Sequence, residues 1–170
     1  ENINTKMIFL STRKVYKNKY NLKESDPVAP NCNYSKNKLI SENILKKTLN
    51  KKVLILRISN LIGPYIKNKN KLHKTFIDIF FENIKKGVIL KSDKCYKDFL
   101  SISKFSQIID GLIKNNAKGT YNVSIGKKIY LKEIVKWLNY YNTKRYNYVK
   151  LKKSSNNESF TLNNRKLMNK

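Results

Sequence analysis

The sequence predicts an α/β fold, because segments with the composition of strands alternate with segments that have the period of helices. The runs at residues 7–10 and 53–58 are short and almost wholly apolar, which is typical of buried parallel strands. Between and after them, apolar residues recur about every 3.6 positions, as on the buried face of a surface helix. The predicted strands cover residues 7–10, 53–58, 88–90, 99–102 and 120–123, and the predicted helices residues 33–50, 76–87, 105–113 and 131–138.

Residues that break helices and strands separate these elements. Residues 17–33 carry Asn, Asp and Pro and predict a loop. Asn33 is a good N-cap for the helix that follows. The Lys- and Asn-rich residues 65–74 predict an exposed loop, and Gly87 ends the next helix. Beyond residue 139 the chain is rich in Tyr, Lys and Asn and gives no clear prediction.

The chain is strongly basic, with a formal net charge of +26. Such a charge is compatible with a nucleic-acid or anionic-membrane partner. It is also compatible with compositional drift, since Lys, Asn and Ile, which all use A/T-rich codons, make up 76 of the 170 residues. Only 4 of the 37 basic residues are Arg, although Arg binds phosphates and bases bidentately, and the lysines are scattered along the chain. We therefore expect drift and no specific nucleic-acid partner.

No apolar run approaches the roughly 18 residues that span a bilayer, so the sequence predicts no membrane partner. No signal peptide is visible. The only two cysteines, Cys32 and Cys95, fit no metal-binding spacing. We expect no metal site and a cytoplasmic location, where thiols stay reduced.

Tyr34 and Lys38 form a Y-x-x-x-K pattern that places both side chains on one face of a helix. The lysine ammonium favours the ionised phenol, which can then act as general base on a substrate hydroxyl. Only Tyr34 follows a buried strand that ends in hydroxyl residues, then a Pro-bearing loop, and precedes another buried strand. This context matters because the spacing alone is uninformative in so Lys-rich a chain. The same pattern begins at Tyr65, Tyr140, Tyr146 and Tyr148.

Several blocks around Tyr34 occur in a fixed order. They are S-T-R-K-V-Y at 11–16, E-S-D-P at 24–27, Y-S-K-N-K at 34–38, R-I-S-N-L-I-G-P at 57–64, K-D-F at 97–99, G-T-Y-N-V at 119–123 and S-F-T-L-N at 159–163. Together they resemble the blocks of the extended short-chain dehydrogenase/reductase family, which contains nucleotide-sugar epimerases, dehydratases and reductases. The resemblance covers nearly the whole chain.

The resemblance implies the C-terminal part of a Rossmann-type doubly wound parallel sheet plus a small α/β substrate-binding domain. Residues 1–62 and 97–125 would belong to the nucleotide-binding domain, and residues 63–96 and 126–170 to the substrate-binding domain. The implied cofactor is NAD or NADP, and the implied partner is a nucleotide-sugar substrate. A homodimer through the region of the Tyr34 helix is also implied for the complete protein.

The resemblance further implies a role for each matching residue at the reacting end. Thr12 would hydrogen-bond the reacting hydroxyl or keto oxygen, and Tyr34 would exchange its proton. Lys38 would hold the nicotinamide ribose and favour the ionised form of Tyr34. Together with Ser11, Tyr34 and Lys38 would contact the cofactor. For Thr12 the alternative is a strand-end hydroxyl that satisfies local backbone groups.

Two further residues would bind the substrate. Asn60 would lie in a substrate-contacting loop, and Lys97 would approach the diphosphate, although the family usually has Arg at that position. The alternatives are a turn residue for Asn60 and a solvated charge for Lys97.

The sequence departs from the family pattern in two respects. All five glycines follow Tyr34, so the glycine-rich turn that binds the cofactor pyrophosphate is not in these 170 residues. Arg13 and Lys14 stand where the 4,6-dehydratases have Asp and Glu, and a cation cannot replace a carboxylate as proton acceptor. We therefore predict a nucleotide-sugar epimerase or keto-sugar reductase, present as a fragment that is inactive alone. The alternative is an inactive remnant or a basic polyanion-binding module that keeps the fold outline.

Overall fold

A three-stranded parallel sheet forms the centre of the computed structural model, which describes residues 6–63, 75–86, 94–141 and 159–169. The strands lie in the order β1 (Met7–Thr12), β2 (Val53–Ile58) and β6 (Gly119–Val123). All three run the same way, so their carboxyl ends meet at one edge of the sheet. In doubly wound folds this edge is where ligands bind.

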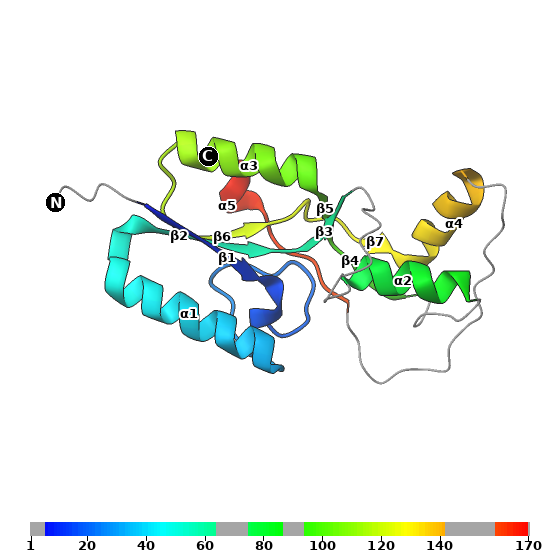
Figure 1. Cartoon of the computed structure of the whole chain (residues 1–170), viewed down its shortest axis with the longest axis horizontal. Helices are drawn as coiled ribbons and strands as arrows, with labels where there is room; N and C mark the ends of the chain where they lie inside the picture. The colour runs from blue at the N-terminus through cyan, green and yellow to red at the C-terminus, as the bar shows by residue number, and fades with distance from the viewer. Residues whose placement is uncertain (1–5, 64–74, 87–93, 142–158, 170) are drawn as a thin grey trace, which may run out of the picture.

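One long helix covers each face of this sheet, α1 (Asn33–Leu49) on one side and α3 (Ile102–Lys114) on the other (Figure 1). Side chains of β2 alternate between the two faces. Leu54 and Leu56 join Phe105 and Leu112 in the apolar cluster beneath α3. Arg57 points to the opposite face, where it meets α1.

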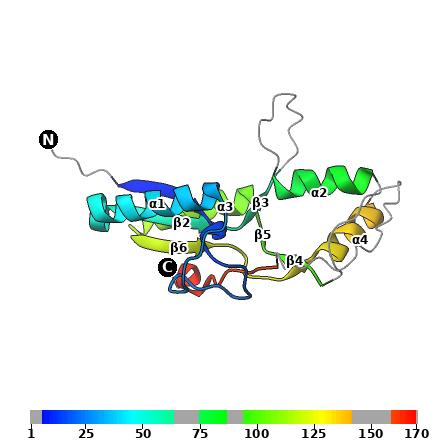
Figure 2. The ribbon, with the colours of Figure 1, turned by 90° about the horizontal axis from the view of Figure 1, so that it is seen from below.

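A second group of small elements extends beyond the carboxyl ends of the central strands (Figures 1 and 2). The group contains β3 (Asn60–Ile62) paired parallel with β5 (Phe99–Ser101), β4 (Tyr96–Lys97) paired antiparallel with β7 (Ile129–Tyr130), α2 (Phe76–Lys85) and α4 (Leu131–Tyr141). Helices α2 and α4 share an apolar cluster that includes Phe80, Phe99 and Val135. The side chain of Thr75 accepts a hydrogen bond from the Asp78 backbone and so caps the N-terminus of α2.

The C-terminal segment closes a third apolar cluster against the loop that follows β1. Phe160 and Leu162 pack against Val15 and Leu22, and all four side chains are buried. Leu22 and Leu162 also form a parallel β-bridge. The short helix α5 (Arg165–Met168) follows this segment. Two short 3-10 helices lie elsewhere in the chain, η1 (Arg13–Val15) after β1 and η2 (Asn50–Lys52) before β2.

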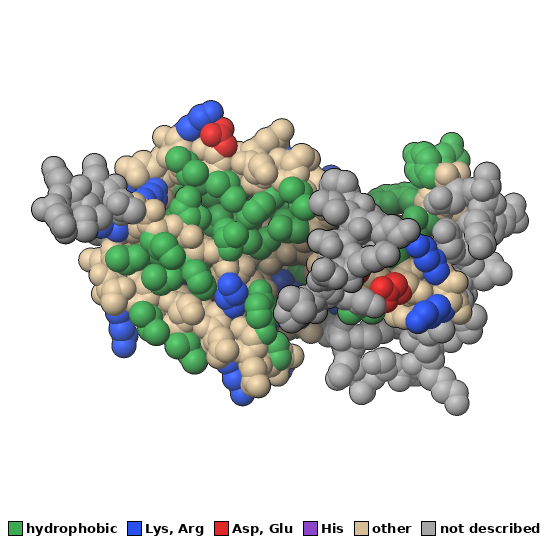
Figure 3. Space-filling model, viewed as in Figure 1, with side chains coloured by type: hydrophobic (Ala, Val, Ile, Leu, Met, Phe, Trp, Pro, Cys, Tyr) green, Lys and Arg blue, Asp and Glu red, His purple; other side chains and the backbone are tan. Residues whose placement is uncertain are grey.

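The predicted α/β class is confirmed, and so are the parallel strands that correspond to β1 and β2. Strand β1 lies at an edge of the described sheet, and Met7 and Leu10 are more than two-fifths exposed, whereas the apolar composition of residues 7–10 taken alone predicts burial. Figure 3 shows hydrophobic side chains gathered on the face between α3 and α1. The predicted N-cap is wrong by one residue: Cys32 is the N-cap and Asn33 is the first helical residue.

Smaller differences concern the short elements. The strand predicted at 99–102 ends at Ser101, because Ile102 already begins α3. Elements β3, β4, β7 and α5 were not predicted. The predicted strand at 88–90 and the predicted loop at 65–74 lie outside the described residues. The two-domain division stays a prediction. Among the described helices, none combines the length and apolarity that crossing a membrane requires.

Candidate active site at the carboxyl end of the central sheet

Tyr34 and Lys38 lie in the first turns of α1, as the context of the Y-x-x-x-K pattern predicts. The Lys38 Nζ atom is 5.9 Å from the centre of the Tyr34 ring. The same ammonium donates a hydrogen bond to the backbone oxygen of Leu10 at 2.9 Å. This bond ties the start of α1 to the end of β1, and the Tyr34 side chain remains more than half exposed.

Thr12 ends β1 and caps the short helix η1. Its Oγ1 atom accepts a hydrogen bond from the Lys14 backbone N–H at 3.2 Å, so the hydroxyl does satisfy a local backbone group. The turn brings the Lys14 ammonium to 5.9 Å from the centre of the Tyr34 ring. Thr12 and Tyr34 therefore belong to the same end of the sheet, while a contact of Thr12 with substrate stays a prediction.

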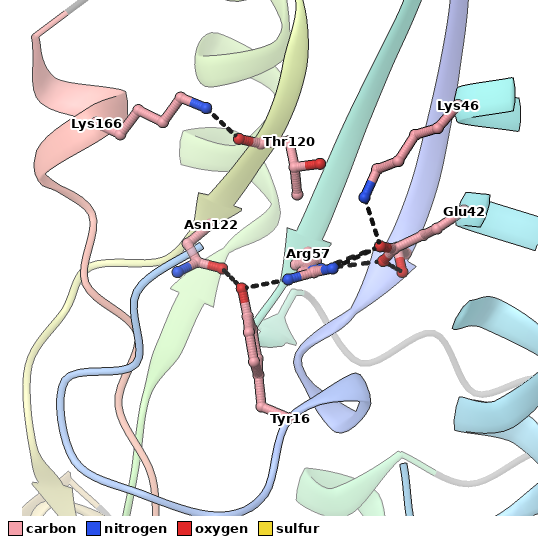
Figure 4. A network of polar contacts seen from close by, with 8 residues as sticks. Tyr16, Glu42, Lys46, Arg57, Thr120, Asn122 and Lys166 are labelled. Carbon is pink, nitrogen blue, oxygen red and sulfur yellow. Dashed lines mark hydrogen bonds and ion pairs between the residues drawn. The ribbon is translucent and has the colours of Figure 1, made fainter. Parts of the chain in front are cut away.

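Ser11 points into the protein beneath this site. Its hydroxyl donates to the Glu42 carboxylate at 2.5 Å, and Glu42 also receives hydrogen bonds from Arg57, the shortest at 2.7 Å (Figure 4). Burial raises the pKa of Glu42, but the hydrogen bonds from Arg57 and Ser11 outweigh burial and hold that pKa below its usual value. The observed partner of Ser11 is thus structural, and its predicted contact with the cofactor stays a prediction.

The same network continues from Arg57 to the loop after β1. Arg57 donates to the Tyr16 hydroxyl at 2.7 Å, and this hydroxyl donates to the Asn122 side chain at 2.9 Å (Figure 4). Burial of Tyr16 raises its pKa, so the phenol stays protonated and can donate. The network therefore joins α1, β2 and β6 to the loop that carries Tyr16.

A cavity of about 260 Å³ opens beside these residues. It brings together Asn60 and Lys97, the two residues predicted to bind substrate. Thr12, Tyr34 and Lys38 do not line it, but Lys14 and Cys32, two residues from Thr12 and Tyr34, do. The described lining contains three cations and no carboxylate side chain. The lining residues are Arg13, Lys14, Tyr16, Asn18, Asn31, Cys32, Asn60, Phe76 and Lys97.

Lys97 is not a solvated charge, since its side chain is only 1% exposed. Its Nζ atom lies 5.1 Å from the centre of the Phe76 ring and 5.7 Å from the centre of the Phe160 ring. The Arg13 guanidinium carbon lies 3.8 Å from the centre of the Phe160 ring. Arg13 and Lys97 therefore both approach Phe160, a residue of the C-terminal segment.

Asp98 holds the parts of this wall together. Its buried carboxylate accepts hydrogen bonds from the backbone N–H groups of Leu162 at 3.0 Å and Gly126 at 3.3 Å. Its backbone oxygen accepts from the Asn60 side chain at 3.2 Å. Asn60 lies in strand β3, so the alternative of a turn residue is wrong. Burial raises the pKa of Asp98 to about 6, although the N–H donors act to lower it.

Several residues that line the cavity were not predicted from the sequence as site residues. Asn18 and Asn31 lie in a loop rich in Asn and Pro, where their composition predicts only turns. Cys32 has no metal-binding spacing, and both cysteines are free thiols. Phe76 belongs to the apolar face of α2. Among the described residues, no group of His, Cys, Asp and Glu could hold a metal ion.

Residues 1–124 match the model of the NAD dependent epimerase/dehydratase family. Since this match covers well over half of the 170 residues, the chain belongs to that family. A search of the curated proteins found no match.

Solved structures show the same fold. A UDP-N-acetylglucosamine 4-epimerase from Methanobrevibacter ruminantium M1, in complex with UDP-N-acetylmuramic acid, has a TM-score of 0.80 and 21% identity, over 96% of this chain and 56% of that chain. The UDP-glucose 4-epimerase of Thermotoga maritima with UDP-glucose has a TM-score of 0.78 and 17% identity, over 97% of this chain and 56% of that chain. WbmG of Bordetella bronchiseptica in complex with NAD and UDP has a TM-score of 0.77 and 22% identity, over 97% of this chain and 52% of that chain. The chain thus spans little more than half the length of these proteins.

Proposed function

We propose that the chain is the tyrosine-lysine and substrate-binding part of an NAD(P)-dependent nucleotide-sugar epimerase or keto-sugar reductase. One observation carries this proposal. Tyr34 and Lys38 stand on α1 at the carboxyl end of β1, and the cationic cavity opens beside them. A base and an anion-binding pocket are the two parts that hydride transfer on a nucleotide sugar requires of the protein.

The described residues fit one end of a nicotinamide cofactor. Tyr34 and Lys38 would hold the nicotinamide ribose. The Ser59 hydroxyl is buried just beyond the end of β2 and has no hydrogen-bond partner among the described residues, as expected of a site that a ligand completes. The 170-residue sequence offers no glycine-rich turn for the pyrophosphate. When bound, the cofactor would accept and return a hydride at the sugar C4.

The protein's own part in the reaction is proton transfer and positioning. Tyr34 would take the proton of the C4 hydroxyl as the hydride leaves, which yields a 4-keto sugar, and would return that proton afterwards. Thr12 would donate a hydrogen bond to the same oxygen. In an epimerase the ketone would turn its other face before it is reduced, whereas a reductase would begin from the ketone.

Elimination of water is not part of the proposal. Arg13 and Lys14 follow Thr12, and neither side chain can accept a proton as the carboxylates of a dehydratase do.

The cavity is the proposed site of the diphosphate. Lys97 and Arg13 both approach Phe160, so two cations lie close to one wall, and Asn60 adds an amide. Cationic side chains of this kind recognise phosphate through charge-assisted hydrogen bonds. A polyanion-binding module would need no such enclosed group, so we prefer the enzyme over that alternative.

We also propose a cytoplasmic homodimer for the complete protein. The exposed face of α1 carries Ile40 and Ile44 one turn apart, and more than half of each side chain is accessible. Apolar side chains that stand together on an exposed helix are typical of an interface.

Titration calorimetry of the 170-residue chain with UDP tests the binding site. We expect measurable binding, which Lys97→Gln weakens about tenfold, because a charge-assisted hydrogen bond contributes on the order of 1.5–3 kcal/mol. Lys36→Gln is the matched control, since Lys36 is an exposed lysine of α1 outside the cavity. Equal effects of the two variants would reduce the site to general electrostatic attraction and contradict the proposal.

A further inference from the structure

The three cations of the cavity are not equivalent. Arg13 and Lys97 approach the same aromatic ring, that of Phe160. Lys14 instead approaches Tyr34, with its ammonium 5.9 Å from the ring centre. Because Tyr34 is the proposed proton acceptor, Lys14 lies at the end of the pocket where the sugar would react. Arg13 and Lys97 lie instead at the part of the wall next to Phe160.

Arg13 is also the more firmly held of the two cations after Thr12. It donates a hydrogen bond to the Asn18 side chain and stacks on Phe160. By contrast, no hydrogen bond or ion pair joins the Lys14 ammonium to any described residue, and its side chain is exposed. The Lys14 ammonium can therefore bind a ligand by exchanging its hydration water, without breaking a hydrogen bond or an ion pair to any described residue.

Charge balance indicates what this ligand carries. The two phosphates of a diphosphate bridge supply about one negative charge apiece, which Arg13 and Lys97 match. No carboxylate side chain stands among the described lining residues, so none of these residues offers Lys14 a carboxylate partner within the cavity. Glu42 does not supply one, because it is buried against Arg57. The nearby Asp98 directs its carboxylate to the backbone of Gly126 and Leu162.

We propose that the preferred substrates are nucleotide sugars whose sugar ring bears a carboxylate, and that Lys14 is the side chain that selects them. This inference rests on the proposed function, since it places the sugar between Tyr34 and the diphosphate site. The selected group is an anion on the sugar itself, such as a uronate, and it is distinct from the diphosphate that all nucleotide sugars share.

The test compares three ligands by titration calorimetry of the 170-residue chain at near-physiological salt. UDP reports the diphosphate site, UDP-glucose adds a neutral sugar, and UDP-glucuronic acid differs from UDP-glucose only by a carboxylate in place of a hydroxymethyl group. We expect UDP-glucuronic acid to bind about tenfold tighter than UDP-glucose, the usual order of effect of a charge-assisted hydrogen bond. Lys14→Gln should abolish most of this preference while the affinities for UDP and UDP-glucose change less than about twofold.

Lys36→Gln removes the same charge from an exposed part of α1 and controls for the overall charge of +26. Its preference for UDP-glucuronic acid should remain. Equal affinity for the two sugars, or a preference that both variants reduce alike, would overturn the inference while leaving UDP binding intact. A chain that binds none of the three ligands would overturn the proposed function as well, so the two failures are distinguishable. Thermal unfolding of Lys14→Gln, an exposed position, verifies that the variant is folded.

Discussion

The Glu42 carboxylate and the Arg57 guanidinium form an ion pair at 2.7 Å, with both side chains buried between α1 and β2. Glu42→Gln should lower the free energy of unfolding by about 3–5 kcal/mol, because it leaves the Arg57 charge buried without a counter-charge. Urea denaturation measures this loss. Asp110→Asn is the control, since it breaks an exposed pair with Lys114 at the same distance and should change little. Similar losses in both variants would contradict the assigned role.

The ionisation of Glu42 should also make the free energy of unfolding depend on pH in the acid range. Its pKa is held below the usual value in the folded protein. The stabilisation is therefore complete above the unfolded pKa, which lies near 4.5, and is lost as the pH falls through the lower folded value. Glu42→Gln should lose this acid-induced decline.

The ionisation of Asp98 should lower the free energy of unfolding as the pH rises, which is the opposite of the effect of Glu42, and it should do so in a higher pH range. Burial raises the pKa of Asp98 from 3.8 to about 6, so the folded protein binds this proton more tightly than the unfolded chain does. Stability from Asp98 is then full below about pH 4 and decreases as the pH rises to about 6, by roughly 3 kcal/mol. Asp98→Asn should lack this decrease. Urea denaturation across pH 4–7 measures it, and parallel curves for the two proteins would refute the prediction.

Tyr34→Phe should abolish catalysis in a protein that also carries the nucleotide-binding part. The phenol takes part in proton transfer, whose loss typically costs about 10²–10⁴-fold in rate. A fall shared by kcat and kcat/KM, with sugar binding unchanged, marks an effect on the transition state. Tyr140→Phe is the matched control, since Tyr140 begins the same Y-x-x-x-K pattern on the exposed surface of α4. Near-normal turnover by Tyr34→Phe would remove it from the active site.

The 170-residue chain should bind UDP but not NAD or NADP. Tyr34 and Lys38 can contact only the ribose beside the nicotinamide, and the sequence has no glycine-rich turn for the pyrophosphate. Calorimetry with each dinucleotide measures this directly. Binding at micromolar concentration would show that other residues of the chain form a pyrophosphate site.

The exposed face of α1 should set the oligomeric state of the complete protein. Ile44→Lys places a charge beside Ile40 on the proposed interface and should shift a dimer towards a monomer in sedimentation velocity. Ile113→Lys introduces the same charge at a similarly exposed isoleucine of α3 and should leave the dimer intact. Dimers that persist in both variants would place the interface elsewhere.

The central fold could be predicted because its signals are local. Residues 53–58 are an almost wholly apolar run too short for a helix, and they form the buried strand β2. The Tyr34 helix needed its context, since four other tyrosines share the spacing. The short strands β4 and β7 have only two residues each, too few for any period to be visible.

The walls of the cavity depend on contacts between distant residues, which local patterns do not encode. The sequence left open whether Lys97 approaches the diphosphate or is a solvated charge, and only the fold shows that it is buried beside Phe160. The hydrogen bond from Leu162 to Asp98 also joins residues far apart in the sequence. Likewise, the openness of β1 depends on its place at the sheet edge and not on its apolar composition. The ordered blocks indicated the family and supplied the predicted site residues, but not these contacts.

The proposed binding site becomes complete only after residues 160–162 have been synthesised and have packed against the loop that follows β1. Tyr34, Lys38 and the cations after Thr12 precede these residues, but the ring that both Arg13 and Lys97 approach belongs to Phe160. Until Leu162 has been added, the carboxylate of Asp98 also lacks one of its backbone donors. A nascent or proteolysed chain that stops short of residue 160 would therefore contain the tyrosine and lysine of the proposed site without the pocket that presents a sugar to them.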